Sequence, residues 1–289
     1  MEFVDVKCPL VSDKCGFDEK FVAQVGLEFP QAYTYAEGIA KIAKVVRELE
    51  QGAICMIPFC HTVEAENYGG NIKLGNAMIG PRCNTPIYAS AEDLLTLPEF
   101  DFGKGRLGEV IKAISLLKAQ GEPVGVEICG PITTLNNLMD MAKLFKIWRK
   151  EPEVVTVTIE KMRVELLKYI EKALDAGVNF ISFEDPAGGL NILGPKYFEQ
   201  QGRNFSYPFI QDALKLIAGR CVMNLCPKTT LQLVSLGFAQ WDEFDLPEKM
   251  TYAKACLELR GKIKLAGNIC IQNHNMLLSN KKMKSLKLL

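Results

Sequence analysis

Short apolar segments alternate with longer amphipathic segments along most of this 289-residue chain. The apolar segments have the length of buried strands, and the segments between them carry apolar residues at helical spacing. Strands are predicted at 53–59, 123–129, 178–185, 221–226, 239–245 and 262–268, and helices at 32–52, 107–121, 132–145, 152–177, 207–220, 229–237 and 247–261. This alternation predicts parallel strands joined by right-handed helical crossovers.

The order and length of these segments favour an α/β fold of the (β/α)8 TIM-barrel type, and a doubly wound open sheet is the alternative. A chain of 289 residues is long for one compact core but ordinary for such a barrel. We therefore expect a single barrel domain over residues 1–289, with a helical lead-in at 1–52 and the barrel at 53–289.

The charge balance and the apolar runs exclude some classes of partner. Lys+Arg and Asp+Glu both number 34, so the chain lacks the basic surplus expected of a nucleic-acid-binding protein. No apolar run approaches the ~18 residues that span a bilayer, and the N-terminus lacks the layout of a signal peptide. The basic, amphipathic segment 279–289 is predicted to be the solvated face of a last helix, with contact to an acidic partner or membrane as the alternative.

Ten cysteines are scattered through the chain without a disulfide-like spacing. Because no export signal is seen, we expect reduced thiols in a cytoplasmic protein. Cys55, Cys129 and Cys256 lie within apolar periodic segments, and we expect each to be a small buried side chain.

In an α/β barrel the chemistry takes place at the carboxyl ends of the strands. The segment PFCHTVEAE, after the first predicted strand, carries Cys60, His61, Glu64 and Glu66 at such an end. These side chains could bind a polar or cationic substrate, hold a metal, or act as a general acid or base. In the structural alternative, Thr62 caps a helical turn and the glutamates lie near its positive end.

Two carboxylates end the most clearly defined strand. Glu184 and Asp185 are neighbours, so their repulsion can raise one pKa and fit that group for acid–base catalysis. Their side chains should point in opposite directions. Pro186 and two glycines follow, which suits a loop that approaches a ligand closely or, in the structural alternative, an Asp-Pro turn.

Asn224 and Cys226 lie two residues apart at the next strand end, where a strand directs both side chains to one face. A cysteine thiolate is a good zinc ligand, but asparagine is a poor one, and a zinc site generally needs at least three protein ligands. From this spacing alone, a metal site, a metal site that has lost a ligand and an ordinary buried strand all stay open.

Taken together, these strand ends resemble the uroporphyrinogen decarboxylase superfamily. The matching stretches are IPFCHTVEAENYGGNIKLGNAMIGPRC, VGVEICGPITTLNNLMD, ISFEDPAGGLNILGPKYFEQ and KLAGNIC, within a resemblance that runs from about Phe29 to about Asn280. Within the superfamily the chain is similar to the corrinoid-dependent methyltransferase branch, typified by methylcobalamin:coenzyme M methyltransferase. The decarboxylase itself is marked by an arginine-rich N-terminal motif, and residues 1–20 of this chain contain no arginine.

The resemblance implies a zinc ion at the barrel mouth that holds the thiol of a methyl acceptor as thiolate, and a separate corrinoid protein that presents methylcobalamin. In that branch the zinc ligands are a His-x-Cys pair and a later cysteine, and Asn224 and Cys226 occupy the place of the pair. A rebuilt site could combine Cys226 with Cys270, Cys60 or His61, and a metal-free enzyme with a different donor or acceptor is the alternative. We expect the barrel to lack the last strand–helix unit, which carries the later cysteine, and the exposed strand edge to favour a homo-oligomer or a covering partner.

The residues and the resemblance together predict a methyltransferase that moves a methyl group between a corrinoid protein and a small thiol or other methyl donor or acceptor. The expected catalytic residues are Asp185, Glu184 and Cys226, the substrate-binding residues are Cys60, His61, Glu64, Glu66 and Gly130, and the metal ligands are Cys226, Asn224 and Cys270. The alternatives are a catalytically degenerate scaffold that binds a corrinoid protein, and a uroporphyrinogen decarboxylase.

Overall fold

The computed structural model describes residue 6 and residues 16–289, so the arginine-free N-terminal stretch lies largely outside the described residues. The strands are β1 (Cys55–Ile57), β2 (Asn71–Lys73), β3 (Arg82–Thr85), β4 (Val124–Cys129), β5 (Phe180–Glu184), β6 (Val222–Leu225), β7 (Ala239–Asp245), β8 (Leu265–Ala266) and β9 (Lys282–Leu288). The helices are α1 (Glu19–Val25), α2 (Ala36–Leu49), α3 (Val63–Asn67), α4 (Ala91–Leu95), α5 (Gly105–Ala119), α6 (Pro131–Leu138), α7 (Met141–Lys150), α8 (Pro152–Ala176), α9 (Leu190–Gln201), α10 (Tyr207–Ile217), α11 (Pro227–Ser235) and α12 (Tyr252–Glu258). Short helical turns are η1 (Gln31–Tyr33), η2 (Pro186–Gly188), η3 (Gly202–Ser206) and η4 (Ile271–Asn273).

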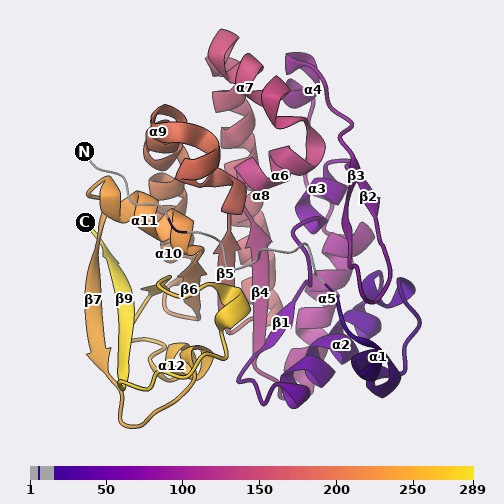
Figure 1. Cartoon of the computed structure of the whole chain (residues 1–289), viewed down its shortest axis with the longest axis vertical. Coiled ribbons are helices and arrows are strands. Elements are labelled where there is room, and N and C mark those ends of the chain that lie inside the picture. The colour runs from indigo at the N-terminus through magenta and orange to yellow at the C-terminus, as the bar shows by residue number, and fades with distance from the viewer. Residues whose placement is uncertain (1–5, 7–15) are drawn as a thin grey trace.

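A mostly parallel sheet forms the centre of the described part of the chain (Figure 1). Its strand order is β1-β4-β5-β6-β8-β9-β7. The first five strands in this order pair in parallel, and β9 pairs antiparallel with both β8 and β7. Strands β2 and β3 form a separate antiparallel pair. The predicted α/β class is therefore confirmed, and within residues 16–289 no ladder joins β1 to β7.

The C-terminal part of the sheet differs from the prediction in two ways. Strand β7 pairs antiparallel with β9 and not in parallel with its neighbours in sequence. The tail, predicted as a helix, forms β9, so that prediction was wrong. From Lys282 to Ser285 the residues alternate between exposed and buried, which is the period of a strand and not of a helix.

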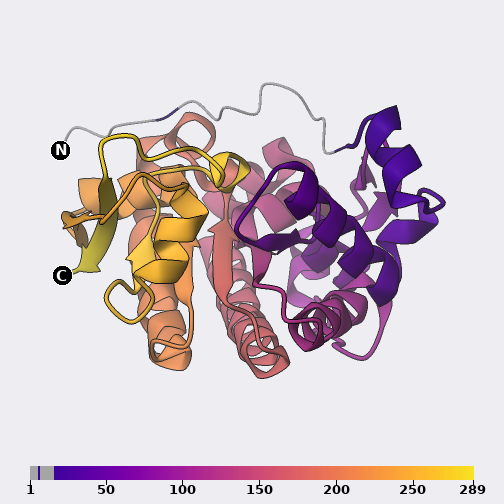
Figure 2. The same cartoon turned by 90° about the horizontal axis from the view of Figure 1, so that it is seen from below.

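One face of the parallel strands packs against the helical layer. Val126, Ile181 and Met223 are in register on neighbouring strands and belong to the main hydrophobic core, together with buried side chains of α5, α8 and α10. Figure 2 shows these long helices together on one side of the molecule. Burial of such aliphatic side chains stabilises the fold by roughly 1.5–3 kcal/mol each.

The opposite face carries a different chemistry, because side chains alternate across a strand. Glu127, Ser182 and Asn224 are in register and form one row, and Cys129 and Glu184 form the next row toward the carboxyl ends. We call these five side chains the polar face. Phe180 and Val222 lie on the same side of the sheet, toward the other ends of β5 and β6. They belong to a smaller hydrophobic cluster with side chains of α12 and of the segment that follows β8.

The cysteines behave as small buried side chains where that was predicted. Cys55, Cys129 and Cys256 are at most 2% exposed, and burial raises the pKa of Cys55 to about 11 and those of Cys129 and Cys256 further. All eight described cysteines are free thiols. Among the described residues, no helix combines the length and the apolar character needed to cross a bilayer.

Candidate active site

A buried chain of hydrogen bonds runs across the polar face. The Tyr252 hydroxyl donates to Asn224 Oδ1 at 2.8 Å, Asn224 Nδ2 donates to Ser182 Oγ at 2.9 Å, and Ser182 Oγ donates to Glu184 Oε1 at 2.5 Å. We call Tyr252, Asn224 and Ser182 the relay. None of the three has any solvent exposure, and Glu184 is only 3% exposed.

Glu184 lies where the relay ends and is paired on its other side with a thiol. Burial raises its pKa to about 7, and hydrogen bonds from Ser182 and Cys226 oppose that rise. Burial, together with the nearby Glu184 carboxyl, raises the pKa of the Cys226 thiol well above its usual range. Cys226 is therefore a neutral thiol at pH 7, and Glu184 is the group of this pair that exchanges a proton near neutrality.

His61 forms an ion pair with Glu127 of the polar face. Its Nε2 lies 3.5 Å from Glu127 Oε2. Burial alone would lower the pKa of His61, but the hydrogen bond and the charge of Glu127 outweigh burial and raise the pKa to about 9. His61 therefore carries a positive charge at pH 7 beside the carboxylates of this face.

A cavity of about 240 Å³ borders Glu127. Met56 and Phe59 line it beside β1, and Ile271 and His274 line it from the segment after β8. Its volume lies just below the range of roughly 300–1,000 Å³ that is usual for drug-sized ligands. The cavity therefore suits a small organic molecule next to the His61–Glu127 pair.

Asp185 has hydrogen-bond partners different from those of Glu184 and anchors the start of α6. Its Oδ1 accepts hydrogen bonds from the backbone N–H of Thr133 at 2.8 Å and from the Thr133 hydroxyl at 2.7 Å, and Oδ2 lies 3.4 Å from the N–H of Ile132. A Cβ atom at Gly130 would lie 2.4 Å from that of Asp185, so this close approach requires glycine. Burial raises the pKa of Asp185 to about 6. Asp185 and Gly130 thus hold the end of β5 and the start of α6 together.

The substitution Asp185→Ala is expected to lower the free energy of unfolding by about 2 kcal/mol, because it leaves the buried N–H and O–H donors of Thr133 without their acceptor. Urea denaturation measures the change. The matched control is Asp140→Ala, because Asp140 is an exposed cap that accepts from Ala142 N and Lys143 N, and loss of such a cap typically costs only about 1 kcal/mol. Equal effects at the two positions would contradict the anchoring role of Asp185.

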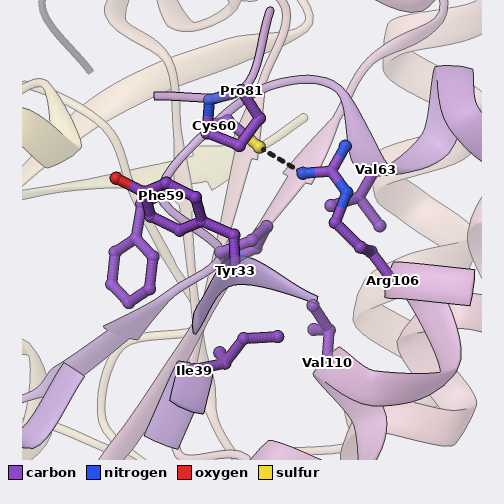
Figure 3. Close-up of a pocket in the computed structure, with 9 residues that line it drawn as sticks. Tyr33, Ile39, Phe59, Cys60, Val63, Pro81, Arg106 and Val110 are labelled. Carbon is purple, nitrogen blue, oxygen red and sulfur yellow. Dashed lines mark hydrogen bonds between the residues drawn. The ribbon is translucent and has the colours of Figure 1, made fainter. Parts of the chain in front are cut away.

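The predicted loop after β1 is fixed by a buried arginine. Arg106 of α5 donates to Cys60 Sγ at 3.2 Å, to Thr62 Oγ1 at 2.8 Å and to Glu66 Oε2 at 2.5 Å. Figure 3 shows its guanidinium directed at the Cys60 sulfur. Thr62 precedes α3 without capping it through its side chain. The cavity beside Cys60 is only about 10 Å³, which is room for about one water molecule, so Cys60 and Glu66 hold the loop in place.

Glu64 connects this loop to β4. Its Oε1 accepts the backbone N–H of Cys129 at 2.8 Å, and burial raises its pKa to about 7. The structure therefore brings His61, Glu64, Glu184 and Cys226 to the carboxyl ends of β1, β4, β5 and β6.

The residues expected to hold zinc do not fit that ion. Both ends of the Asn224 amide are engaged, Oδ1 by Tyr252 and Nδ2 by Ser182, and the Cys226 thiol is paired with Glu184. Within the described residues, no three His, Cys, Asp or Glu side chains are grouped so that they could hold a metal. Since a zinc site needs at least three such ligands, we derive no step through zinc.

Five functional neighbours of the site were not predicted from the sequence. Glu127 and Ser182 could have been found from strand alternation, because each lies two residues before a predicted strand-end residue. Tyr252 and Arg106 reach the site from helices, and no local sequence pattern marks either residue. Tyr252 is 28 residues from its partner Asn224, and Arg106 is 46 residues from its partner Cys60. Lys228, 7% exposed, holds the loop after Asp185 through the Pro186 carbonyl at 3.3 Å and the start of α9 through Asn191 Oδ1 at 2.7 Å.

Comparison with known proteins gives concordant results. The family model described as Uroporphyrinogen decarboxylase (URO-D) matches residues 18–282. The chain is 24% identical over 257 residues to the methylcobamide:CoM methyltransferase MtaA of Methanosarcina barkeri, covering 85% of this chain and 73% of that protein. It is 24% identical over 208 residues to the methylcobamide:CoM methyltransferase MtbA of Methanosarcina mazei, covering 71% and 61%. A solved methyltransferase structure from Methanosarcina mazei has the same fold, with a TM-score of 0.64 at 21% identity over 82% of this chain and 68% of that one.

Proposed function

From the premise that the chain belongs to the uroporphyrinogen decarboxylase (URO-D) family, we propose that it is a methyltransferase of a corrinoid-dependent system. It moves a methyl group between the corrinoid of a partner protein and a small thiol or other small donor or acceptor. Two relatives that bear the name methylcobamide:CoM methyltransferase support this reaction class. We further propose that the parallel strands form the wall of a single barrel domain of the family's type.

The observation that carries the proposal is the carboxyl of Glu184 at the end of β5. It lies between the relay and the Cys226 thiol, and its pKa of about 7 fits proton exchange with a substrate at neutral pH. The cavity of about 240 Å³ that borders Glu127, whose charge acts on Glu184, offers room for the small molecule. The positive charge of His61 beside Glu127 favours a thiolate that forms nearby.

The proposed step is an in-line transfer. When a thiol is the acceptor, its S–H proton passes to the Glu184 carboxylate and its sulfur attacks the methyl carbon of methylcobalamin. The new S–C bond forms as the Co–C bond breaks, and the electron pair of the broken bond stays on cobalt. The protein holds the thiol and the methyl group in line, and this positioning supplies most of the catalysis.

Other side chains of the site have supporting roles in this proposal. Cys60 and Glu66, fixed by Arg106, hold the loop that carries His61 and Glu64. Asp185 and Gly130 hold the start of α6 against the end of β5. The corrinoid protein docks over the carboxyl ends of the strands, where its methyl group can reach the small molecule.

The test is methyl transfer from methylcobalamin to coenzyme M and to a set of neutral and cationic small thiols. The absorbance change of the corrinoid and the mass of the thioether measure the product. Thioether formation in proportion to the amount of protein supports the proposal. Binding of a corrinoid protein without any transfer would instead support the scaffold alternative, and decarboxylation of uroporphyrinogen would support the third candidate.

A further inference from the structure

We infer that the relay of Tyr252, Asn224 and Ser182 takes the place of a metal ion, and that it positions Glu184 to receive the S–H, N–H or O–H group of the small molecule. This inference rests on the proposed function for the identity of the reaction. Its structural part, a metal-free wall with a fixed carboxyl, stands on the hydrogen bonds alone.

The number of hydrogen atoms sets the direction of the relay. The Tyr252 oxygen accepts the backbone N–H groups of Gly267 and Ile269, so its single hydrogen is directed to Asn224 Oδ1. Ser182 accepts from Asn224 Nδ2, so its single hydrogen is directed to Glu184 Oε1. Every donor in the chain therefore points toward Glu184.

This direction decides what Glu184 can do. Ser182 holds its Oε1 as an acceptor, and Cys226 also hydrogen-bonds to this carboxyl. Two donors fix the orientation of the carboxyl and still leave acceptor sites for a ligand, because a carboxylate has about four such sites. An orientation that is set before the substrate arrives lowers the cost of reaching the reactive geometry. Tyr252, Asn224 and Ser182 are thus positioning residues.

The same hydrogen bonds argue against a metal at this place. A metal on Asn224 would have to compete with the 2.8 Å hydrogen bond from Tyr252 in a site with no solvent exposure. Loss of that bond would leave a buried hydroxyl hydrogen without its partner. The small molecule that fits such a wall is a hydrogen-bond donor, either neutral or cationic, and not a thiolate bound to zinc.

Metal content is the first test, and it does not depend on methyl transfer. The protein is incubated with excess zinc, desalted, and analysed for zinc by mass spectrometry. We expect far less than one zinc ion per chain, with no difference between the wild type and Cys226→Ala. About one zinc ion per chain, lost in Cys226→Ala, would overturn the inference.

The second test reads the position of the Glu184 carboxyl by infrared spectroscopy at pH 5, below its pKa of about 7. The C=O band of the protonated acid is assigned by its loss in Glu184→Gln. We expect the band to shift in Tyr252→Phe and in Ser182→Ala, because the relay polarises this acid. The control is Tyr169→Phe, since the Tyr169 hydroxyl is equally buried and has no hydrogen-bond partner among the described residues.

An unchanged C=O band in both Tyr252→Phe and Ser182→Ala would overturn the positioning role. Where the chain catalyses methyl transfer, Tyr252→Phe should also lower kcat about 10-fold with little change in KM. Failure of all methyl transfer, with the band shifts present and zinc absent, would overturn the proposed function and leave the relay in place. The two failures are therefore distinguishable.

Discussion

Glu184→Gln is expected to lower the rate of methyl transfer by about 10²–10⁴-fold, the usual contribution of a general acid or base. Glutamine keeps an oxygen that can accept the hydrogen bond from Ser182, so the relay and the fold stay intact. What it loses is the carboxylate that takes the substrate's proton. The measurement is kcat for thioether formation from methylcobalamin, with circular dichroism and thermal unfolding as checks of the fold.

The matched control for this substitution is Glu165→Gln. Glu165 is as buried as Glu184 but lies on α8 within the helical layer, where it accepts from the backbone N–H of Phe100 and pairs with Lys168. We expect its variant to keep kcat within about threefold of the wild type, since it removes a buried carboxyl that does not belong to the polar face. If Glu184→Gln kept full activity as well, Glu184 would not be the proton acceptor and the proposed mechanism would be wrong.

Strand alternation made part of this site predictable. Asn224 and Cys226 were expected to share one face, and both contact the Glu184 side of the sheet, directly or through Ser182. The same period of two predicts opposite directions for Glu184 and Asp185, and the two carboxyls have different partners, Ser182 for Glu184 and Thr133 for Asp185. These predictions succeeded because they depend only on neighbouring residues of a strand.

The relay and the C-terminal strands depend on contacts that no local pattern specifies. Tyr252 reaches Asn224 from a helix that follows β7, and only the folded chain brings the two together. The tail carries lysines at several spacings, so its charge pattern suited a helix face. Its antiparallel pairing with β7 aligns Lys282 with Asp245 and Lys284 with Glu243, and this long-range pairing decides for a strand.

The stability of the protein is expected to fall as the pH rises from about 4 to about 9. Burial raises the pKa of Glu64 and of Glu184 from 4.5 to about 7, and that of Asp185 from 3.8 to about 6. The folded state therefore binds more protons than the unfolded state between the two values of each group. Stability is then fully present below the unfolded pKa and is lost as the pH rises through the folded pKa.

His61 extends the same trend to higher pH. Its pKa rises from 6.5 to about 9, since the hydrogen bond and the charge of Glu127 outweigh burial. The stabilisation from its ion pair is thus complete below about pH 6.5 and is lost as the pH rises through 9. A shift of 2.5 pH units corresponds to about 3 kcal/mol per group. Urea denaturation at intervals from pH 5 to pH 9 should show a steady decrease in the free energy of unfolding.

Two variants separate the two halves of this pH range, and each serves as the control for the other. Glu64→Gln keeps an acceptor for the Cys129 N–H but cannot ionise, so it should match the wild type near pH 4.5 and exceed its stability by up to about 3 kcal/mol at pH 8. His61→Gln should lose stability below pH 6.5 and approach the wild type at pH 9, because it removes an ion pair that the wild type itself has lost there. A wild-type stability that rises from pH 5 to pH 9 would contradict the burial of these carboxyls. A Glu64→Gln variant less stable than the wild type at pH 8 would show that the Glu64 carboxylate is satisfied by the Cys129 N–H and carries no penalty at neutral pH.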